Sequence, residues 1–328
     1  MAIKKNDQKR IIILISGLIA IAILVMFLSL LVGSVFISPK DLWTSEILWQ
    51  VRLPRVLLAA FVGMLLSTSG VVLQGVLRNP LADPYILGVS AGGAIGAAIS
   101  IVLGAQFVVL GMSSVPAMAF LFSLLAVYVV YRLSRIGKKT SPETLLLAGV
   151  ALSAFCSAVL SLIVIISGNL QSIYFWLLGS LSSANWTNVY TVIPYAVIGL
   201  GIAYFYSKEL NALLLGEDMA HTLGVEVEKS RVMLIIAASF MSAAAVSVSG
   251  LVGFVGLIVP HWIRMLVGPN HRILVPVSAL AGAIFVVLAD TISRTIFSPT
   301  EIPIGIVMSL AGAPFFLYLL RKRRMEGK

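Results

Sequence analysis

The sequence predicts an all-α polytopic membrane protein with about ten transmembrane helices and both termini in the cytoplasm. Of its 328 residues, 59% are hydrophobic and only 11% are charged, less than half the roughly 25% of charged residues in soluble domains. The mean hydropathy of +1.05 is too high for a protein that must cover its surface with polar groups. Several uncharged stretches also exceed the ~20 residues that a spanning helix needs. Composition therefore excludes a soluble enzyme.

The uncharged windows, taken in chain order, define the predicted spans. Two of them are long enough for two helices each: 84–131, with a turn near 104–116, and 144–207, with a turn around 168–188. The first window follows Lys4, Lys5, Lys9 and Arg10, but it is too long for a signal peptide, so we expect a retained span. The complete set of windows without Asp, Glu, Lys or Arg is 11–39, 56–77, 84–131, 144–207, 232–263, 273–289 and 302–320.

The window 232–263 needs an even number of crossings, because Arg231 and Arg264 at its two ends both look cytoplasmic under the positive-inside rule. A break at Ser247–Gly250 gives two short helices and a total of ten spans, which places both termini inside. Of the 23 Lys and Arg residues, this topology leaves only Lys40, Arg52, Arg55 and Arg294 outside. The net charge of +10 thus reflects topology, and we expect no nucleic-acid partner.

Several kinds of functional site are missing from the sequence. The single Cys156 rules out disulfides within the chain, and the three histidines have no metal-ligand spacing. The predicted spans are almost uncharged, with Asp290 and Glu301 near helix ends, which argues against a channel or an ion-coupled secondary carrier. No nucleophile–base constellation of an intramembrane enzyme is present. Because no phosphate-binding loop GxxxxGK[ST] occurs either, energy for uphill transport must come from another subunit.

Two polar inserts are predicted on the cytoplasmic side. Residues 78–84 (RNPLADP) contain two prolines and form a stiff corner. The longer insert, 208–231, is expected to form short helices, with Glu217 and Asp218 at a helix start and Gly224 as a stop. From the residues alone, this insert is either a contact segment or a solvated loop.

Small residues and isolated arginines have two interpretations each. Gly88, Gly92 and Gly96 recur at every fourth position, which favours close helix packing over a role in lining a substrate path. The arginines predicted outside are suited to bind carboxylates of a partner protein. Alternatively they are anchors at the membrane edge.

These motifs, in this order, resemble the membrane permease family of ABC importers for iron siderophores, haem and vitamin B12. The resemblance covers about residues 45–320 and implies the type II importer architecture: one transmembrane permease domain over 1–328, a second permease copy, two ABC ATPases that bind ATP and Mg²⁺, and an extracytoplasmic binding protein. It also implies that this chain binds no cofactor and is not an enzyme, and that it is located in the cytoplasmic membrane of a prokaryote. The motifs are RLPRVLLAAFVGMLLSTSGVVLQGVLRNPLADPYILGVSAGG (52–93), LLLAGVALS (145–153), LLLGEDMAHTLGVEVEKSR (213–231), GFVGLIVPHWIRMLVGPNHR (253–272) and LADTISRTIFSPTEIPIGIVMSLAGAPFFLYLL (288–320).

The resemblance also implies roles for single residues. It implies that Arg52, Arg55 and Arg294 dock the binding protein, that Asn79 and Leu81 form a cytoplasmic gate, and that 213–224 is the coupling segment on the ATPase. The family's second gate, in the loop 140–144, cannot be placed. An iron siderophore is the expected cargo because it is the commonest in the family, with haem and cobalamin as alternatives. Charge reversal of Arg52 and Arg55 should then abolish uptake and leave assembly intact. The expected ATPase contacts are Glu217, Met219, Ala220, Leu223 and Gly224.

Overall fold

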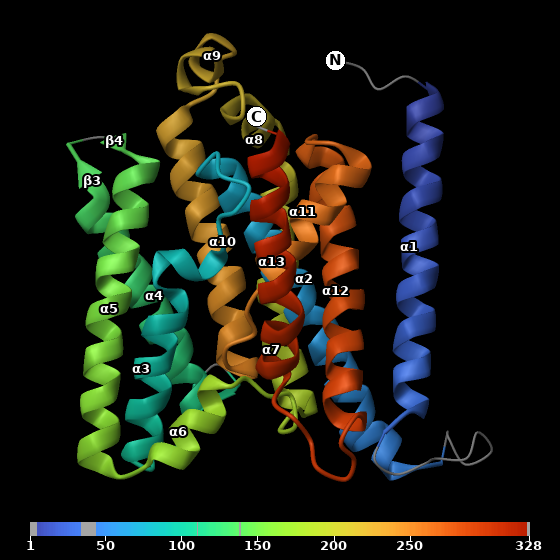
Figure 1. Cartoon of the computed structure of the whole chain (residues 1–328), viewed down its shortest axis with the longest axis vertical. Helices are drawn as coiled ribbons and strands as arrows, with labels where there is room; N and C mark the ends of the chain where they lie inside the picture. The colour runs from blue at the N-terminus through green and yellow to red at the C-terminus, as the bar shows by residue number, and fades with distance from the viewer. Residues whose placement is uncertain (1–4, 34–43, 110, 138, 327–328) are drawn as a thin grey trace.

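The computed structural model describes residues 5–33, 44–109, 111–137 and 139–326 as a bundle of helices that run between two ends (Figure 1). The start of α1 and the end of α13 lie at the end that carries α8 and α9, and α6 lies at the opposite end. Two short hairpins, β1–β2 and β3–β4, are antiparallel. The elements are α1 (Lys5–Leu31), η1 (Leu48–Arg52), α2 (Leu53–Val76), η2 (Pro84–Leu87), α3 (Val89–Val102), β1 (Val108–Val109), β2 (Met112–Ser113), α4 (Ser114–Ser134), β3 (Arg135–Ile136), β4 (Lys139–Thr140), α5 (Pro142–Ser167), α6 (Leu170–Leu177), α7 (Trp186–Phe205), α8 (Ser207–Leu213), α9 (Glu217–Thr222), α10 (Val227–Ser249), α11 (Val255–Val267), α12 (His271–Thr295) and α13 (Ile304–Glu326).

Local sequence signals set the ends of several helices. The side chain of Ser141 accepts hydrogen bonds from the first amides of α5, and Asn185 and Asn270 do the same for α7 and α12. Gly168 ends α5 with a φ of 67°, a conformation that a side chain would strain. Ser141 and Asn270 lie between predicted windows, whereas Gly168 and Asn185 lie at the turn predicted inside the window 144–207.

The predicted division into helices is confirmed where the structure describes it. The window 84–131 covers α3 and most of α4. The window 144–207 covers most of α5 and all of α7, with the additional helix α6 in the turn, and the window 232–263 is broken after Ser249. Within the described ranges, seven helices are long and apolar enough to cross a membrane, and Val89–Val102, Val255–Val267 and Ile304–Tyr318 are shorter apolar helices. The count of ten crossings therefore stays a prediction, and α10, at 23 residues, is not short as expected.

The core of the bundle is formed by α2, α10 and α12. In α2, 83% of the most apolar window is buried, against 11% in α1 and in α5. Close helix contact explains this core: a Cβ atom at Gly63 would lie 2.1 Å from the carbonyl oxygen of Gly282. The repeated glycines of α3 are packed equally closely. A Cβ atom at Gly92 or Gly96 would lie 2.3 or 2.2 Å from carbonyl oxygens of α4. These two glycines pack α3 against α4.

A non-helical segment, 250–254, separates α10 from α11 and lies beside η2. Gly250 and Phe254 both have positive φ, of 65° and 67°. The Tyr85 hydroxyl donates to the carbonyl of Val252 and accepts from its amide, both at 3.0 Å. Backbone groups that would otherwise be unpaired inside the bundle are thus satisfied by a side chain from η2.

Candidate functional site

A buried ion-pair network lies at the end of the molecule opposite α9. The Arg55 Nε atom donates to both Asp290 oxygens, at 3.0 and 3.1 Å, and its Nη1 atom donates to both Glu301 oxygens, at 3.0 and 2.9 Å. Arg55 is 7% exposed and Asp290 only 1%. Because Arg55 and Asp290 are paired and shielded from water, and Glu301 is also paired with Arg55, this network holds the start of α2 to the end of α12 and to the segment that leads into α13.

The two other predicted docking arginines also point inward. Arg294 pairs with Asp290 at 3.5 Å and donates from Nη2 to the Ser29 carbonyl oxygen and hydroxyl, at 2.5 and 2.6 Å. Arg52 donates from Nη1 to the carbonyl oxygens of Leu30 and Leu31. The two arginines thereby attach the peripheral helix α1 to α12 and to η1, which leads into α2.

The structure thus brings Arg55 and Arg294 together on one carboxylate, at the end of the bundle where the topology predicted them, but buries their side chains. Sequence analysis missed their partners, Asp290 and Glu301. The Asp290–Arg294 spacing of four residues on one helix was an available signal, because such pairs face each other. The contacts of Arg55 span 235 and 246 residues, and nothing local in the sequence indicates them.

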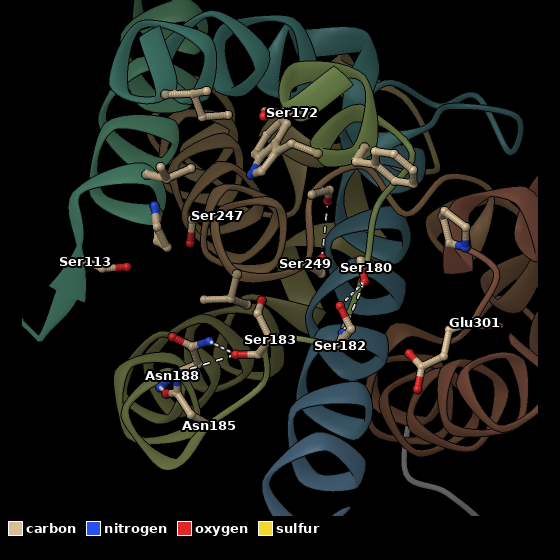
Figure 2. Close-up of a pocket in the computed structure, with 18 of the residues that line it drawn as sticks. Ser113, Ser172, Ser180, Ser182, Ser183, Asn185, Asn188, Ser247, Ser249 and Glu301 are labelled. Atoms are coloured by element: carbon tan, nitrogen blue, oxygen red, sulfur yellow. Dashed lines mark hydrogen bonds between the residues drawn. The ribbon is translucent and has the colours of Figure 1, made fainter. Parts of the chain in front are cut away.

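Next to this network is a pocket of about 660 Å³. Figure 2 shows serine and asparagine side chains from several separate segments around it, with Glu301 on one side. Among the described residues that line the pocket, Glu301 is the only charged one, and Arg55 already pairs with it. The polar lining residues are Ser113, Ser172, Ser180, Ser182, Ser183, Asn185, Asn188, Ser247, Ser249 and Glu301. The pocket therefore offers many weak hydrogen bonds and no free positive charge.

The corner at 78–84 lies at the other end of the bundle and is internally hydrogen-bonded. The Asn79 side chain accepts from the Leu81 amide at 3.0 Å, and the Asp83 carboxylate caps η2 by accepting from the Tyr85 amide at 2.8 Å. Asp83 has the extended backbone expected before a proline, with φ −103° and ψ 144°. The break in the helix and the extended conformation before Pro84 are confirmed, and the stiffness of the corner and the gating role of Asn79 and Leu81 stay predictions.

The environment of the half-buried Asp83 carboxyl leads to a prediction about pH dependence. Burial raises the pKa of its carboxyl from 3.8 to about 6, and the bond from the Tyr85 amide lowers it by less. The folded state then holds the proton more tightly than the unfolded state, so this group lowers stability as pH rises from about 4 to 6. Asp83→Asn keeps the cap without the charge. The difference between its melting temperature in detergent and that of the unsubstituted chain should therefore increase in favour of the variant as pH rises across this range. Asp218→Asn, at an exposed position, is the control; a constant Asp83→Asn difference from pH 4 to 7 would contradict the prediction.

The predicted coupling segment, 213–224, begins at the last residue of α8 and contains the whole of α9, which projects from the bundle (Figure 1). Met219 and Leu223 are 52% and 60% exposed, and Gly224 is exposed with a φ of 80°. Ala220 is fully buried, and Glu217 pairs with Arg231 inside this chain. The apolar surface available to a partner is therefore carried by Met219 and Leu223, with the two neighbouring leucines Leu214 and Leu215 also exposed.

A second pocket, of about 580 Å³, brings this segment together with the corner and with the loop that could not be placed. Arg78 and Asn79 line it from the corner, Thr140 and Ser141 from the loop before α5, and Glu217 from α9. Only the tertiary structure shows that these three segments meet.

Residues 21–322 match the model of the FecCD transport family. The chain is 48% identical over 281 residues to the cobalamin import system permease of Halobacterium salinarum, covering 85% of this chain and 74% of that protein. It is 39% identical to the hemin transport system permease of Yersinia pestis, covering 95% of this chain and 97% of the relative. A solved metal-chelate-type ABC transporter in an inward-facing conformation superimposes with a TM-score of 0.85 and 37% identity, covering 94% of this chain and 98% of that one.

Proposed function

Because this chain belongs to the FecCD transport family, we propose that it is the membrane permease of an ATP-driven importer that takes up a metal chelate. Family membership and its apolar helices make it a multi-pass protein of the inner membrane and a transport subunit that is not itself an enzyme. The match over residues 21–322, nearly the whole chain, carries the proposal. In this mechanism the chain performs no chemistry, and its helices switch which side of the membrane has access to the path.

The proposed partners are two ABC ATPases, a second copy of the permease and an extracytoplasmic binding protein. The exposed apolar surface of Met219 and Leu223 supports an ATPase contact, because a projecting helix with an uncovered apolar side needs a partner. The ATPases would bind ATP and Mg²⁺. Movement of α9 on ATP binding would then be passed to the inner end of the path, where Asn79 and Leu81 are the proposed gate.

The proposed docking site for the binding protein is the arginine network. Glu301 is about one-third exposed, whereas Asp290 is buried. An incoming carboxylate would therefore compete with Glu301 for Arg55, which lies beside the pocket that receives cargo. Complementary charge of this kind mainly sets the rate and the register of docking.

The side chains that line the pocket indicate which kind of chelate it can bind. A lining of hydroxyl and amide groups, with its single carboxylate paired, suits a bulky chelate with a neutral hydrogen-bonding periphery better than one with several free carboxylates. An iron siderophore without free carboxylates is the first candidate. Cobalamin is the second, favoured by the 48% identity to a cobalamin permease. Haem, with two propionates, fits this lining less well.

Reconstitution tests the proposed function. The permease, its ATPase and its binding protein should together accumulate labelled ferric hydroxamate or labelled cobalamin in liposomes when ATP is supplied on the ATPase side, and omission of any one partner should stop uptake. Hemin serves as the third labelled cargo. Uptake by the permease alone, driven by an ion gradient, would instead indicate a secondary carrier and contradict the proposal.

A further inference from the structure

A buried arginine lies where three segments of the inner end meet. Arg231, on the first turns of α10, is 3% exposed. Its Nη1 atom donates to the Thr140 carbonyl oxygen at 2.8 Å and to Glu228 at 3.0 Å, and its Nη2 atom donates to Glu217 at 2.5 Å. One side chain therefore joins the end of β4, the helix α10 and the short helix α9.

Neighbouring contacts extend this connection. The Thr140 hydroxyl donates to Glu228 at 2.7 Å, so the loop before α5 is held twice. Glu217 also contacts the corner 78–84, because the Nη2 atom of Arg78, the first residue of the corner, lies 3.9 Å from the Glu217 carboxylate. The loop, the corner and α9 are thus all connected to a single guanidinium, directly or through Glu217.

The contacts of Arg231 are strong because its own side chain is only 3% exposed, although Glu217 and Glu228 are about one-third exposed. A guanidinium presents its donors in a rigid planar fork, so it can hold a backbone carbonyl and two carboxylates at fixed angles. Loss of one partner would leave a buried charge uncompensated. Lys229, two residues before Arg231 in the chain, pairs with Glu226, but both of these side chains are exposed. Such surface ion pairs contribute little to stability.

The geometry points to Arg231 as the positioning residue that makes α9 move as one body with Thr140 and the start of α5. This inference rests on the proposed function, in which an ATPase moves α9. Displacement of α9 would pull Arg231 through Glu217, and Arg231 would carry Thr140 and the loop 140–143 with it. The corner at Arg78 would be linked more weakly, because its contact with Glu217 is 3.9 Å long and exposed on both sides. The inner end of the path would then respond to α9 without direct contact between the ATPase and the gate.

The test uses the assembled transporter with Arg231→Gln and Arg231→Lys. The lysine variant keeps the charge that Glu217 and Glu228 neutralise, so it is expected to fold, but a single ammonium cannot span α9 and the Thr140 carbonyl as the fork does. Both variants should still co-purify with the ATPase, because Met219 and Leu223 stay exposed. Stimulation of ATP hydrolysis by the binding protein should fall by roughly tenfold, within the usual range for coupling between two sites. Lys229→Gln is the matched control on the same helix and should keep full stimulation.

Spin labels provide a readout that loss of stability alone would not move. With Cys156→Ser as background, labels at Asp218→Cys on α9 and Glu143→Cys on α5, both exposed positions, should keep one narrow distance with and without a non-hydrolysable ATP analogue. In Arg231→Lys the distance should broaden and shift with nucleotide. Retained stimulation and a narrow distance in this variant would overturn the inference. If the unsubstituted complex shows no stimulated hydrolysis, the proposed function fails, and the label distances in the lysine variant still decide whether Arg231 links the two segments.

Discussion

Arg55→Glu is expected to abolish the folded permease, in contrast to the sequence-based expectation that assembly would survive. The substitution would place a third carboxylate against Asp290 and Glu301, which Arg55 now contacts at 2.9–3.1 Å. Removing one partner of a buried ion pair costs about 3–5 kcal/mol, and repulsion between like charges adds to this. We therefore expect aggregation or loss of the monodisperse peak in size-exclusion chromatography of the detergent-extracted protein.

A paired substitution separates the structural role of Arg55 from docking. Arg55→Met together with Glu301→Gln removes one charge of each sign and leaves Arg294 paired with Asp290, which is often close to neutral for stability when the volume is filled. This variant should regain the monodisperse peak but still lack stimulation by the binding protein, since the proposed docking charge is absent. An Arg55→Glu protein with an unchanged elution profile and melting temperature would show that the network does not hold these helix ends together. Normal stimulation of the paired variant would remove Arg55 from the docking site.

Gly70→Ala is expected to have the second large effect. A Cβ atom at Gly70 would lie 1.9 Å from the carbonyl oxygen of Gly256 and 2.6 Å from two further backbone atoms of that residue. Gly256 is itself closely packed, because a Cβ atom on it would lie 2.6 Å from Pro84 of η2 and 2.9 Å from the carbonyl oxygen of Leu66 on α2. Since backbone has to move, the cost should reach at least the upper end of the ~1–3 kcal/mol typical of overpacked cores. Thermal unfolding in detergent measures it.

Gly201→Ala is the matched control, and its effect on stability should have the opposite sign. Gly201 lies within α7, is exposed, and a Cβ there would meet no atom within 4 Å. Alanine in a helix interior is favoured over glycine by up to about 1 kcal/mol. Gly201→Ala should therefore leave the melting temperature unchanged or raise it slightly. Equal effects at the two positions would show that the contact between α2 and α11 is not as close as the structure places it.

The positions of the helices could be predicted from the sequence, but the roles of single residues could be predicted only in part. The glycines at 92 and 96 show the limit: their spacing indicates a face for close packing, but the spacing is the same whether a helix or a cargo lies against it. Ala220 shows it again. Its place in the coupling segment was predicted, but its burial depends on how α9 folds back on α8 and α10, which no local pattern specifies.

What the sequence by itself determined is the class of protein, the helix breaks and the two polar inserts 78–84 and 208–231. Apolar length is a local property with a threshold set by the thickness of the bilayer, and prolines and glycines act where they stand. What only the tertiary structure decided is which charges meet: Arg55 with Asp290 and Glu301, and Arg231 with Thr140 and Glu217. Most of these contacts join residues far apart in the chain, and their strength comes from burial, which exists only once the helices have packed.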